Sequence, residues 1–588
     1  MAKARYPDVW LEPSDNKVHA LIPTKNGEID IVVSEYISIL TLVKNIDTGR
    51  FKADLEYLAP DGCIEVIQVD RDVLLDPNKI TQLHNLGVDV RMDRIKYVIQ
   101  HFSNEEIYAP VRYVHEKLGF DTLNGNTFFK HKELIGSTIE SEYEGSLEIG
   151  PSGSKENWNR MFMKEVLGHA PAEFAIIAGL SSSVNAFIAN EIGSDTIIVH
   201  ISGYSSTGKS TLLSLVISMY GYPFSSRTGL FGNFNATQNA LIKTLSGLNG
   251  IPVAFDELSM FSSKKPDSFV YQMVTGTEKA RLNRQASFRE KATWLTTILT
   301  NGEIPIAKES SNAGIQARVF EINDMQCTRD AGNAERIKAC INENFGWIGP
   351  EFVDFLLKYG KESVISLYYQ KHTEMKQFFI AKGISDSIVD RRLIKYAIFL
   401  VTAELFQLYM KVNLKIDEIM QIFVGIERDS IAKRNYKETV IEYLKNYISI
   451  NARRFEVIDK RPKGTNTSEP NGEKYGRMIL RDSEVEIEFN ENSFLECLAK
   501  GGYENSRTVL NELKKSGYLD FEKDKTYRKR KDSLGIIRKV YVLKFTDFVL
   551  KSQLDSLDRM IRRQPDEAIK KKLLKEKKRL IDLNEANN

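Results

Sequence analysis

Residues 195–221 limit the fold of this chain more than any other segment. "DTIIVHIS" (195–202) is a short, β-branched apolar run, typical of a buried strand. "TLLSLVISMYG" (211–221) is typical of a helix that ends at Gly221. Between them, Gly203-Tyr-Ser-Ser-Thr-Gly-Lys-Ser fits GxxxxGK[ST] at every fixed position. Strand, glycine loop and helix in this order predict a phosphate-binding loop on a sheet; the alternative is a coincidental Ser/Gly turn.

Taken alone, the loop predicts that a nucleoside triphosphate binds with Mg²⁺, as it would in a kinase or a GTPase; ATP is expected from the motifs that follow it. Its glycines allow a tight turn whose N–H groups surround phosphate oxygens, and the following helix directs its positive end at them. We expect Lys209 to reach the β- and γ-phosphates and Ser210 to bind Mg²⁺. The expected nucleotide-binding set is Gly203, Tyr204, Ser205, Ser206, Thr207, Gly208, Lys209, Ser210 and Thr211.

An acidic pair follows a second apolar strand, "IPVAF" (251–255). Asp256 would hold Mg²⁺, and Glu257 would polarise the attacking water. Taken alone, Asp-Glu after a strand is also a common solvated loop start. The pair lies far enough beyond Lys209 to leave room for the intervening helix, strand and helix.

Two further polar positions complete a candidate hydrolytic set. "TWLTTILTN" (293–301) ends in Thr300-Asn301, where a polar side chain can orient the lytic water, the role called sensor 1; the alternative is an Asn-Gly turn. Arg318 stands at the start of the strand in "ARVFEIN" (317–323). An arginine there can neutralise charge on the γ-phosphate of a neighbouring subunit, or form a surface salt bridge.

This succession of motifs resembles the AAA+ ATPases. More closely, "GYSSTGKST", "VAFDEL", "TEKARLNRQASFREKATWLTTILTNGE" and "AGIQARVFEI" are similar to a family of helicases encoded by phages and mobile elements. The nearest named relatives are the replicative helicases of staphylococcal cassette chromosomes, considered relatives of the minichromosome maintenance (MCM) helicases. The resemblance covers roughly residues 160–410, and the first 150 residues match weakly. The similarity of "VDRRLIKYAIFLVTAEL" makes Arg391 a candidate sensor 2 arginine, or else an ordinary charged helix face.

The expected fold is α/β and multidomain. We predict a mixed α+β N-terminal domain (1–150), an AAA+ core with a parallel sheet flanked by helices (151–330) and a helical region (331–450). A winged-helix domain (451–548) and a charged helical tail (549–588) would follow.

Two basic segments are candidate DNA contacts. In MCM-type ATPases a hairpin before the sensor strand projects into a central pore, which assigns Arg284, Arg289 and Lys291 to phosphates, with Phe288 stacking on a base or packing the hairpin. In the winged-helix region, "SRTVLNELKKSG" (506–517) resembles a recognition helix, and Arg528, Lys529, Arg530 and Lys531 lie in a basic wing. The alternatives are a solvated hairpin and a protein-interaction module.

Composition bounds the location and the partners. The net charge is only +2, from 81 Lys+Arg against 79 Asp+Glu, so local charge clusters decide more than the total. The four cysteines form no CxxC pair, which favours a reducing compartment and argues against a zinc site. The N-terminus lacks the apolar core of a signal peptide, and "YAIFLVTAELFQLYM" is interrupted by Glu404. We therefore expect a cytoplasmic protein without a membrane span.

The predicted function is an ATP-dependent, ring-forming DNA helicase, expected to be a hexamer, for replication of a mobile element, phage or plasmid. The pore would hold one strand, the winged helix would contact duplex or origin DNA, and element-encoded replication proteins are candidate partners. Two alternatives stay open. One is an AAA+ loader or remodeller that does not unwind DNA, and the other is an initiator that uses ATP as an assembly switch. A fused primase is not supported, because residues 1–150 show no paired-carboxylate motif or zinc cluster.

Overall fold

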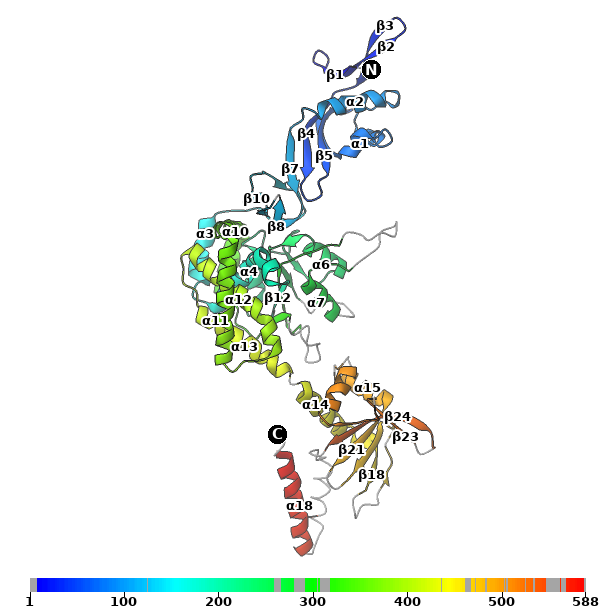
Figure 1. The fold of residues 1–588 in the computed structure, drawn as a ribbon, viewed down its shortest axis with the longest axis vertical. Helices are drawn as coiled ribbons and strands as arrows, with labels where there is room; N and C mark the ends of the chain where they lie inside the picture. Colours follow the sequence, from blue (N-terminus) through cyan, green and yellow to red (C-terminus); the bar gives the residue numbers. More distant parts are fainter. Residues whose placement is uncertain are drawn as a thin grey trace. The chain divides into compact units, whose positions relative to one another are not determined.

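The structure is a computed structural model of the chain. It describes residues 8–585 except 124, 258–265, 280–290, 304, 307–317, 435, 461–466, 471, 482–483, 502, 504–505, 524, 532–534, 546–560 and 562–566. The chain forms two compact units, the first reaching Glu427 and the second beginning at Arg428 (Figure 1).

The N-terminal region contains small sheets and two covering helices. Strands β1 (Val9–Glu12), β2 (Lys17–Thr24) and β3 (Gly27–Ser34) form one sheet. A second sheet has the order β11-β7-β4-β5-β6, with strands at Glu142–Tyr143, Val111–His115, Ile37–Asn45, Phe51–Leu58 and Ile64–Asp70. Helices α1 (Arg71–Leu75) and α2 (Ile95–Glu105) share an apolar core with these strands. The predicted mixed α and β content of this region is present.

A third sheet joins the N-terminal region to the rest of the first unit. Its order is β10-β9-β8-β14, with strands at Leu134–Ile135, Asn126–Lys130, Leu118–Leu123 and Leu248–Asn249. Gly119 in β8 lies so close to β14 that an added Cβ would stand 1.7 Å from the carbonyl oxygen of Asn249. Glycine is therefore required at this junction.

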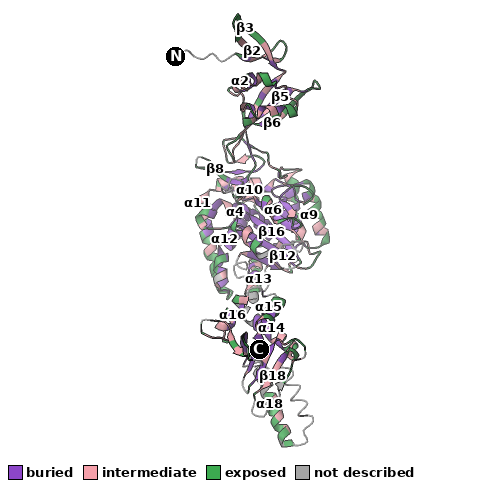
Figure 2. Ribbon diagram, turned by 90° about the vertical axis from the view of Figure 1, so that its right-hand side faces the viewer, coloured by how far each residue is buried: buried purple, intermediate pink, exposed green. Residues whose placement is uncertain are grey.

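The centre of the first unit is a parallel sheet, as predicted. Its order is β13-β15-β16-β12-β17, with strands at Phe231–Asn233, Val253–Asp256, Thr297–Gly302, Ile197–Ser202 and Val319–Asn323. All four neighbouring pairs are parallel. The helices that accompany these strands are α5 (Lys209–Ile217), α6 (Gln238–Leu245) and α7 (Pro266–Thr275). Figure 2 shows buried residues running through β12, β16 and the neighbouring helix α4. Because the strands are parallel, their carboxyl ends meet at one edge of the sheet and their amino ends at the other.

Helix α4 (Ala170–Ile192) packs against this sheet. It has proline in its first turn and ends at Gly193, whose φ of 67° provides the left-handed cap. The serines that weaken a helix prediction bind the sheet instead: Ser181 contacts Thr297, and Ser182 contacts Thr296, at 3.1 and 3.2 Å between hydroxyl oxygens. The buried hydroxyls of Ser181 and Ser182 are thus satisfied by threonines at the start of β16.

The helical region follows as predicted. A short helix α3 (Lys155–Met161) precedes α4, and α9 (Ala331–Glu343), α10 (Ile348–Tyr359), α11 (Lys361–Ala381), α12 (Ser387–Met410) and α13 (Ile416–Arg434) follow the sheet. Helices α4 and α12 are long and apolar enough to span a membrane. However, 94% and 67% of their apolar windows are buried inside the structure, as in core helices.

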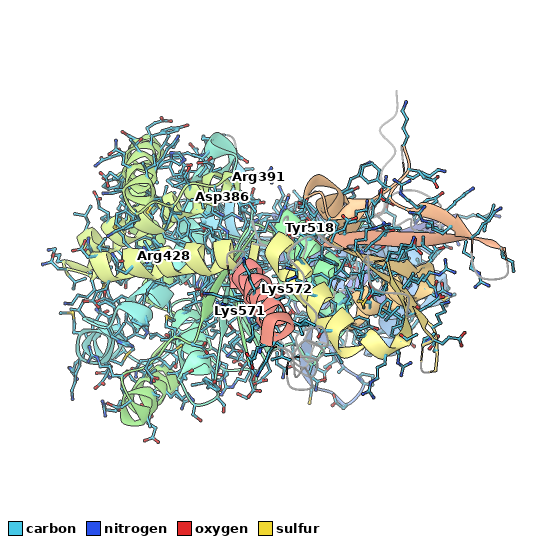
Figure 3. The ribbon with its side chains drawn as sticks, turned by 90° about the horizontal axis from the view of Figure 1, so that it is seen from below. Asp386, Arg391, Arg428, Tyr518, Lys571 and Lys572 are labelled. Atoms are coloured by element: carbon cyan, nitrogen blue, oxygen red, sulfur yellow. The ribbon has the colours of Figure 1, made fainter. Side chains whose placement is uncertain are left out.

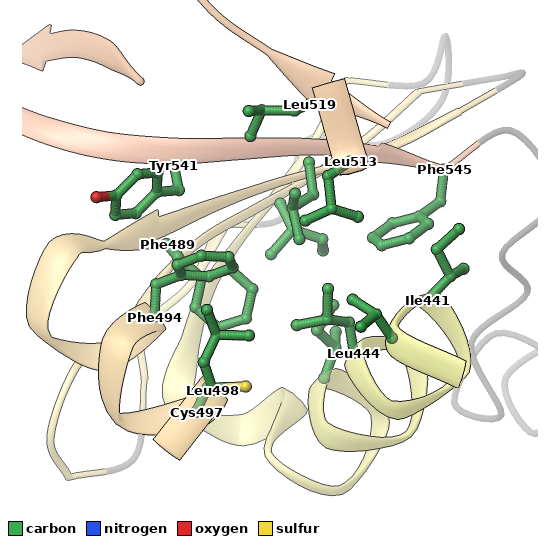
Figure 4. Packing of buried hydrophobic residues seen from close by; sticks show 14 of the residues in the cluster. Ile441, Leu444, Phe489, Phe494, Cys497, Leu498, Leu513, Leu519, Tyr541 and Phe545 are labelled. Atoms are coloured by element: carbon green, nitrogen blue, oxygen red, sulfur yellow. The ribbon is translucent and has the colours of Figure 1, made fainter. Parts of the chain in front are cut away.

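The second unit is a mixed sheet packed against three helices. Its main strand order is β19-β18-β20-β21-β24-β22, at Thr467–Ser468, Phe455–Asp459, Gly476–Leu480, Val485–Asn490, Ile537–Phe545 and Leu519–Asp520, and β23 (Arg528–Lys531) pairs with β24. Helices α14 (Tyr436–Ile450), α15 (Glu491–Lys500) and α16 (Ser506–Lys515) cover it. Ile441 and Leu444 of α14 belong to the same apolar core as Phe489 and Phe494 (Figure 4). Helix α14, which the sequence had placed before residue 451 in the helical region, therefore belongs to this unit. The tail contains helix α18 (Glu567–Glu585).

Candidate functional site

The glycine loop leaves the carboxyl end of β12 and enters α5. Gly208 has φ of +89°, and an added Cβ would stand 2.5 Å from Thr328 Oγ1. Gly203 has φ of +138° and lies against Asp324. Ser206 also adopts a left-handed conformation, with φ of 66°. Only glycine is free of strain at the first two positions, so the loop conformation explains why the motif fixes them.

The segment after β17 supports the loop from behind, and sequence reasoning missed it. The N–H of Cys327 donates to the carbonyl of Thr207 at 3.0 Å, and the N–H of Asp324 donates to the carbonyl of Ser202, also at 3.0 Å. Burial raises the pKa of the Cys327 thiol to about 12, against the opposing effect of the nearby Lys209. This thiol is therefore a neutral packing group under the loop. A small apolar residue after the last strand offers no sequence signal for that role.

Lys209 lies across the loop it follows. Its Nζ donates to the carbonyl oxygens of Gly203 at 2.8 Å and of Tyr204 at 2.5 Å. The ammonium is thus held at the concave side of the turn, where the N–H groups of a phosphate loop converge. Tyr204 is 82% exposed, whereas the side chain of Thr211 is buried, so Thr211 can contribute only backbone to a nucleotide site.

Ser210, Asp256 and Asn301 come together from three elements. Ser210 Oγ donates to Asp256 Oδ1 at 3.1 Å, and Asn301 Nδ2 donates to Ser210 Oγ at 3.2 Å. The strand order accounts for this cluster, because β16 with Asn301 lies between β12 and β15 with Asp256. A hydroxyl and a carboxylate oxygen are ligands that Mg²⁺ accepts, so the donor set fits that ion.

Glu257 has a strained backbone beside this cluster. Its φ is 59°, which is uncommon for a residue with a side chain, and its N–H donates to Asn301 Oδ1 at 2.9 Å. Backbone strain of this kind persists only where the surroundings enforce it, and it gathers at functional positions. Asn301 therefore joins the serine hydroxyl to the backbone of the exposed Glu257.

Thr300 points to a different environment from Asn301. Its Oγ1 lies 2.8 Å from His200 Nδ1 on the adjacent strand, and both residues are fully buried. Successive residues of a strand face opposite sides. Of the two residues left open by the sequence, Asn301 is the one whose side chain lies beside Ser210.

Arg318 lies at the opposite edge of the sheet from the glycine loop. In the parallel register Ile198 pairs with Val319 and Ser202 pairs with Asn323. Arg318, directly before Val319, is therefore separated from the loop by the length of the strand, about 17 Å at 3.3 Å per residue. That is farther than an arginine side chain extends. Its guanidinium carbon lies 5.1 Å from the ring centre of Tyr271 on α7.

Arg391 and Arg392 are adjacent on α12 but differ in environment. Arg391 is exposed (Figure 3). Arg392 is buried, pairs with Glu427 at 2.8 Å, and donates to the carbonyl of Val319 at 3.0 Å. This end of α12 therefore lies at the amino edge of the sheet, as Arg318 does, and Arg391 is not among the residues at the glycine loop.

Arg284 and Arg289 of the expected hairpin lie outside the described residues, as does Phe288. The residues that flank the expected hairpin are described. Thr277 pairs antiparallel with Thr293, and the N–H of Glu278 donates to the carbonyl of Ala292 at 2.8 Å. Lys291 beside these residues is exposed. The described residues on the two sides of 280–290 are thus paired with each other.

The basic strand β23 divides its cations between two environments. Arg528 pairs with Asp520 at 2.5 Å, and Arg530 pairs with Glu488 at 3.0 Å. Lys529 and Lys531 alternate with them and are exposed. The sequence grouped all four as DNA contacts, but the two arginines already neutralise carboxylates of the same unit. Sequence alone could not separate them, because their partners lie on other strands.

Comparisons with known proteins agree with this organisation. Residues 16–293 match the family described as a domain of unknown function (DUF927). Residues 435–547 match the Cch helix turn helix domain, whose limits agree with the inclusion of α14 in the second unit. The solved structure "SCCmec type IV Cch - active helicase" superposes with a TM-score of 0.68 at 22% identity, covering 93% of this chain and 98% of that one.

The chain shares the fold of Cch. The resemblance to the helicases of staphylococcal cassette chromosomes predicted from the sequence is confirmed. It also extends further than the motifs indicated, because the DUF927 match begins at residue 16 and the structural likeness covers nearly the whole chain. None of the curated proteins matches this sequence.

Proposed function

We propose that this chain is an ATP-driven, ring-forming DNA helicase that acts in the cytoplasm in the replication of a mobile element, phage or plasmid. The observation that carries the proposal is the division of its AAA+ motifs between the two edges of one sheet. Lys209, Ser210, Asp256 and Asn301 lie at the carboxyl edge, and Arg318 lies at the amino edge. The solved Cch of the same fold is described as an active helicase.

At the carboxyl edge, the loop N–H groups and Lys209 bind the β- and γ-phosphates of ATP. Lys209 exchanges its two loop carbonyls for phosphate oxygens. Ser210 and Asp256 hold Mg²⁺, which when bound neutralises charge on the phosphates. Glu257 accepts a proton from the attacking water as general base. Asn301 orients Glu257 through the backbone N–H and faces the same space as sensor 1.

At the amino edge, Arg318 reaches the γ-phosphate bound by a neighbouring copy of the chain. The strand length between Arg318 and its own loop supports this assignment, because it is greater than the reach of an arginine side chain. Arg391, exposed at the same edge, acts there as sensor 2. A site that needs both edges closes only in a head-to-tail ring, for which we propose a hexamer.

DNA is held by two basic elements. The hairpin on the base at Thr277 and Thr293 presents Lys291, with Arg284 and Arg289, to one strand in the pore. Phosphate contact needs cations and no particular base, which suits translocation. In the winged-helix unit, Lys529 and Lys531 contact duplex or origin DNA, because the arginines of β23 are paired within the unit.

A forked-DNA unwinding assay with both tail polarities tests this function, with Lys209→Ala as the inactive control. We expect ATP-dependent strand separation on one polarity and none with the variant. If the wild-type ring hydrolyses ATP but separates no fork at any salt concentration, the chain is a loader or remodeller. If ATP drives assembly with negligible turnover, it is an initiator.

A further inference from the structure

A buried ion pair joins two helices to the strand that follows Arg318. Arg392 of α12 and Glu427 of α13 are 2% and 0% exposed, and their Nη1 and Oε1 atoms lie 2.8 Å apart. Tyr396 donates its hydroxyl to the same carboxylate oxygen at 2.8 Å. The other terminal nitrogen of Arg392 donates to the carbonyl of Val319 at 3.0 Å. The pair therefore fixes the first residue of β17 as well as the two helices.

Stability alone does not explain a charge pair at this depth. The free energy of removing two charges from water offsets much of the free energy of their attraction. Apolar residues of similar volume often stabilise the packing of two helices as well or better. Apolar residues cannot donate to the carbonyl of Val319, however. Among the described residues, β17 is also the last strand of the sheet on its side, so the donor to Val319 comes from a helix and not from a neighbouring strand. The planar guanidinium satisfies both acceptors at once, which is the geometry that arginine provides and lysine does not.

A second buried cation at this edge gives a matched comparison. Lys395, one turn further along α12, pairs with Asp195 at 2.6 Å and donates to the carbonyl of Thr196 at 3.0 Å. Burial lowers the pKa of Lys395, Asp195 opposes that shift, and the charges of Arg318 and Arg392 lower it further. The three cations are therefore neighbours. Lys395 fixes the start of β12, whereas Arg392 fixes the start of β17.

We propose that Arg392, held by Glu427, is a positioning residue that aims Arg318 at the nucleotide of the neighbouring subunit. The contact acts on the carbonyl of Val319, the residue directly after Arg318, so a shift of that carbonyl displaces the backbone from which the arginine side chain projects. An arginine that acts across a subunit boundary has to be aimed from its own subunit, because misplacement of a catalytic group by about 1 Å can cost 10²-fold in rate. The inference rests on the proposed shared site.

Mixing experiments with the full chain test it. Arg318→Ala subunits keep an intact nucleotide site and need an arginine from a neighbour, whereas Lys209→Ala subunits supply the arginine only. We expect the mixture to recover ATPase activity. With Lys209→Ala/Arg392→Met/Glu427→Met as the donor, we expect the recovered rate to fall about tenfold to a hundredfold. With Lys209→Ala/Lys395→Met as the donor, it should stay within about twofold of the first mixture, since the start of β17 is untouched.

The reverse orientation separates positioning from a general loss of structure. Arg318→Ala/Arg392→Met/Glu427→Met subunits, mixed with Lys209→Ala donors, should recover the full rate, because their own site does not use their own Arg392. An equal loss in both orientations, or no loss in either, would overturn the inference. If the plain Lys209→Ala and Arg318→Ala mixture recovers nothing, the shared site itself fails. Arg392→Lys is the second donor variant should the double methionine variant not fold: it keeps a charge opposite Glu427 but cannot form both contacts, so we expect the same one-sided loss.

Discussion

The two edges of the parallel sheet differ in how their polar residues are arranged. At the carboxyl edge, Ser210, Asp256 and Asn301 form a connected hydrogen-bond cluster, and Glu257 is held in a left-handed conformation beside it. At the amino edge, Arg392 and Glu427 are buried and neutralise each other in an ion pair. On the proposed function, the carboxyl edge presents polar groups to the nucleotide, whereas the amino edge uses them to fix the starts of strands.

This difference between the edges limits which nucleotide site Arg318 and Arg391 can serve. Arg318 and Arg391 lie at the edge whose buried charges are already paired, while the phosphate loop lies at the other. Arg318 cannot reach its own loop while β17 is intact, and Arg391 is not among the residues at that loop. On the proposed function, each subunit therefore contributes to two different nucleotide sites, one through each edge. Variants at the two edges should then differ in their effects on ATP turnover and ATP affinity.

The largest effect is expected from Arg318→Ala. An arginine that neutralises charge in phosphoryl transfer contributes about 10³ to 10⁵ in turnover, so we expect a loss of that order. Affinity for ATP should change little, because the loop and Lys209 are untouched. Turnover and binding of a fluorescent ATP analogue measure the two quantities, with Arg160→Ala on α3 as an exposed control. A matching loss of affinity in Arg318→Ala would place this arginine in its own subunit's site and remove the distinction between the edges.

Asn301→Ala should give the next largest effect. It removes the amide that contacts Ser210 and the Glu257 backbone, and the loss of one preorganised polar group at a reacting centre costs about 10² to 10³ in turnover. Thr300→Val is the matched neighbour: it loses the contact to His200 and should cost about 1–3 kcal/mol of stability with turnover within a few fold. Steady-state ATPase rates and thermal unfolding of the same preparations compare them. The opposite ranking in turnover would show that Thr300 is the sensing side chain.

How much of this was predictable depended on whether a contact was local. The glycine loop, the acidic pair, the sensor strand and Arg318 can be singled out from local patterns. The strand order then brings Asp256 and Asn301 to the loop and places Arg318 at the opposite edge. The buried pair of Arg392 and Glu427 could not be predicted, because it joins residues of different helices that share no motif. Likewise nothing local distinguishes Arg528 from Lys529, since Asp520 and Glu488 decide the difference from neighbouring strands.

Strand β23 shows a similar contrast, between two arginines that form ion pairs within the unit and two exposed lysines. Lys529→Ala/Lys531→Ala should weaken duplex binding and reduce the slope of log affinity against log salt by about 2, since each lost phosphate contact removes about 0.9. Arg528→Ala/Arg530→Ala should leave that slope nearly unchanged but lower stability, because Asp520 and Glu488 each lose one cationic partner. Fluorescence anisotropy across a salt series measures both. If both double variants reduce the slope equally, the ion pairs of Arg528 and Arg530 open when DNA binds.

The smallest effect concerns a buried histidine beside the end of α5 that lies away from the glycine loop. His131 donates from Nε2 to the carbonyl of Tyr220, just beyond the end of α5, at 2.7 Å, and burial lowers its pKa to about 4. The folded state thus binds fewer protons here than the unfolded state, whose histidine pKa is about 6.5. The stability contributed by the neutral ring is complete above about pH 6.5 and is lost as the pH falls toward 4.

Between pH 7.5 and 5.5 the expected loss from His131 is about 1.3 kcal/mol. Chemical denaturation at the two pH values measures it in the wild type and in His131→Gln, with the exposed His84→Gln as control. The His131 variant should be less stable at pH 7.5 and lose less on acidification, while the control should follow the wild type. If His131→Gln and the wild type lose the same stability, the proton is taken up elsewhere. Stability would then depend on pH through groups such as His115, whose pKa burial also lowers.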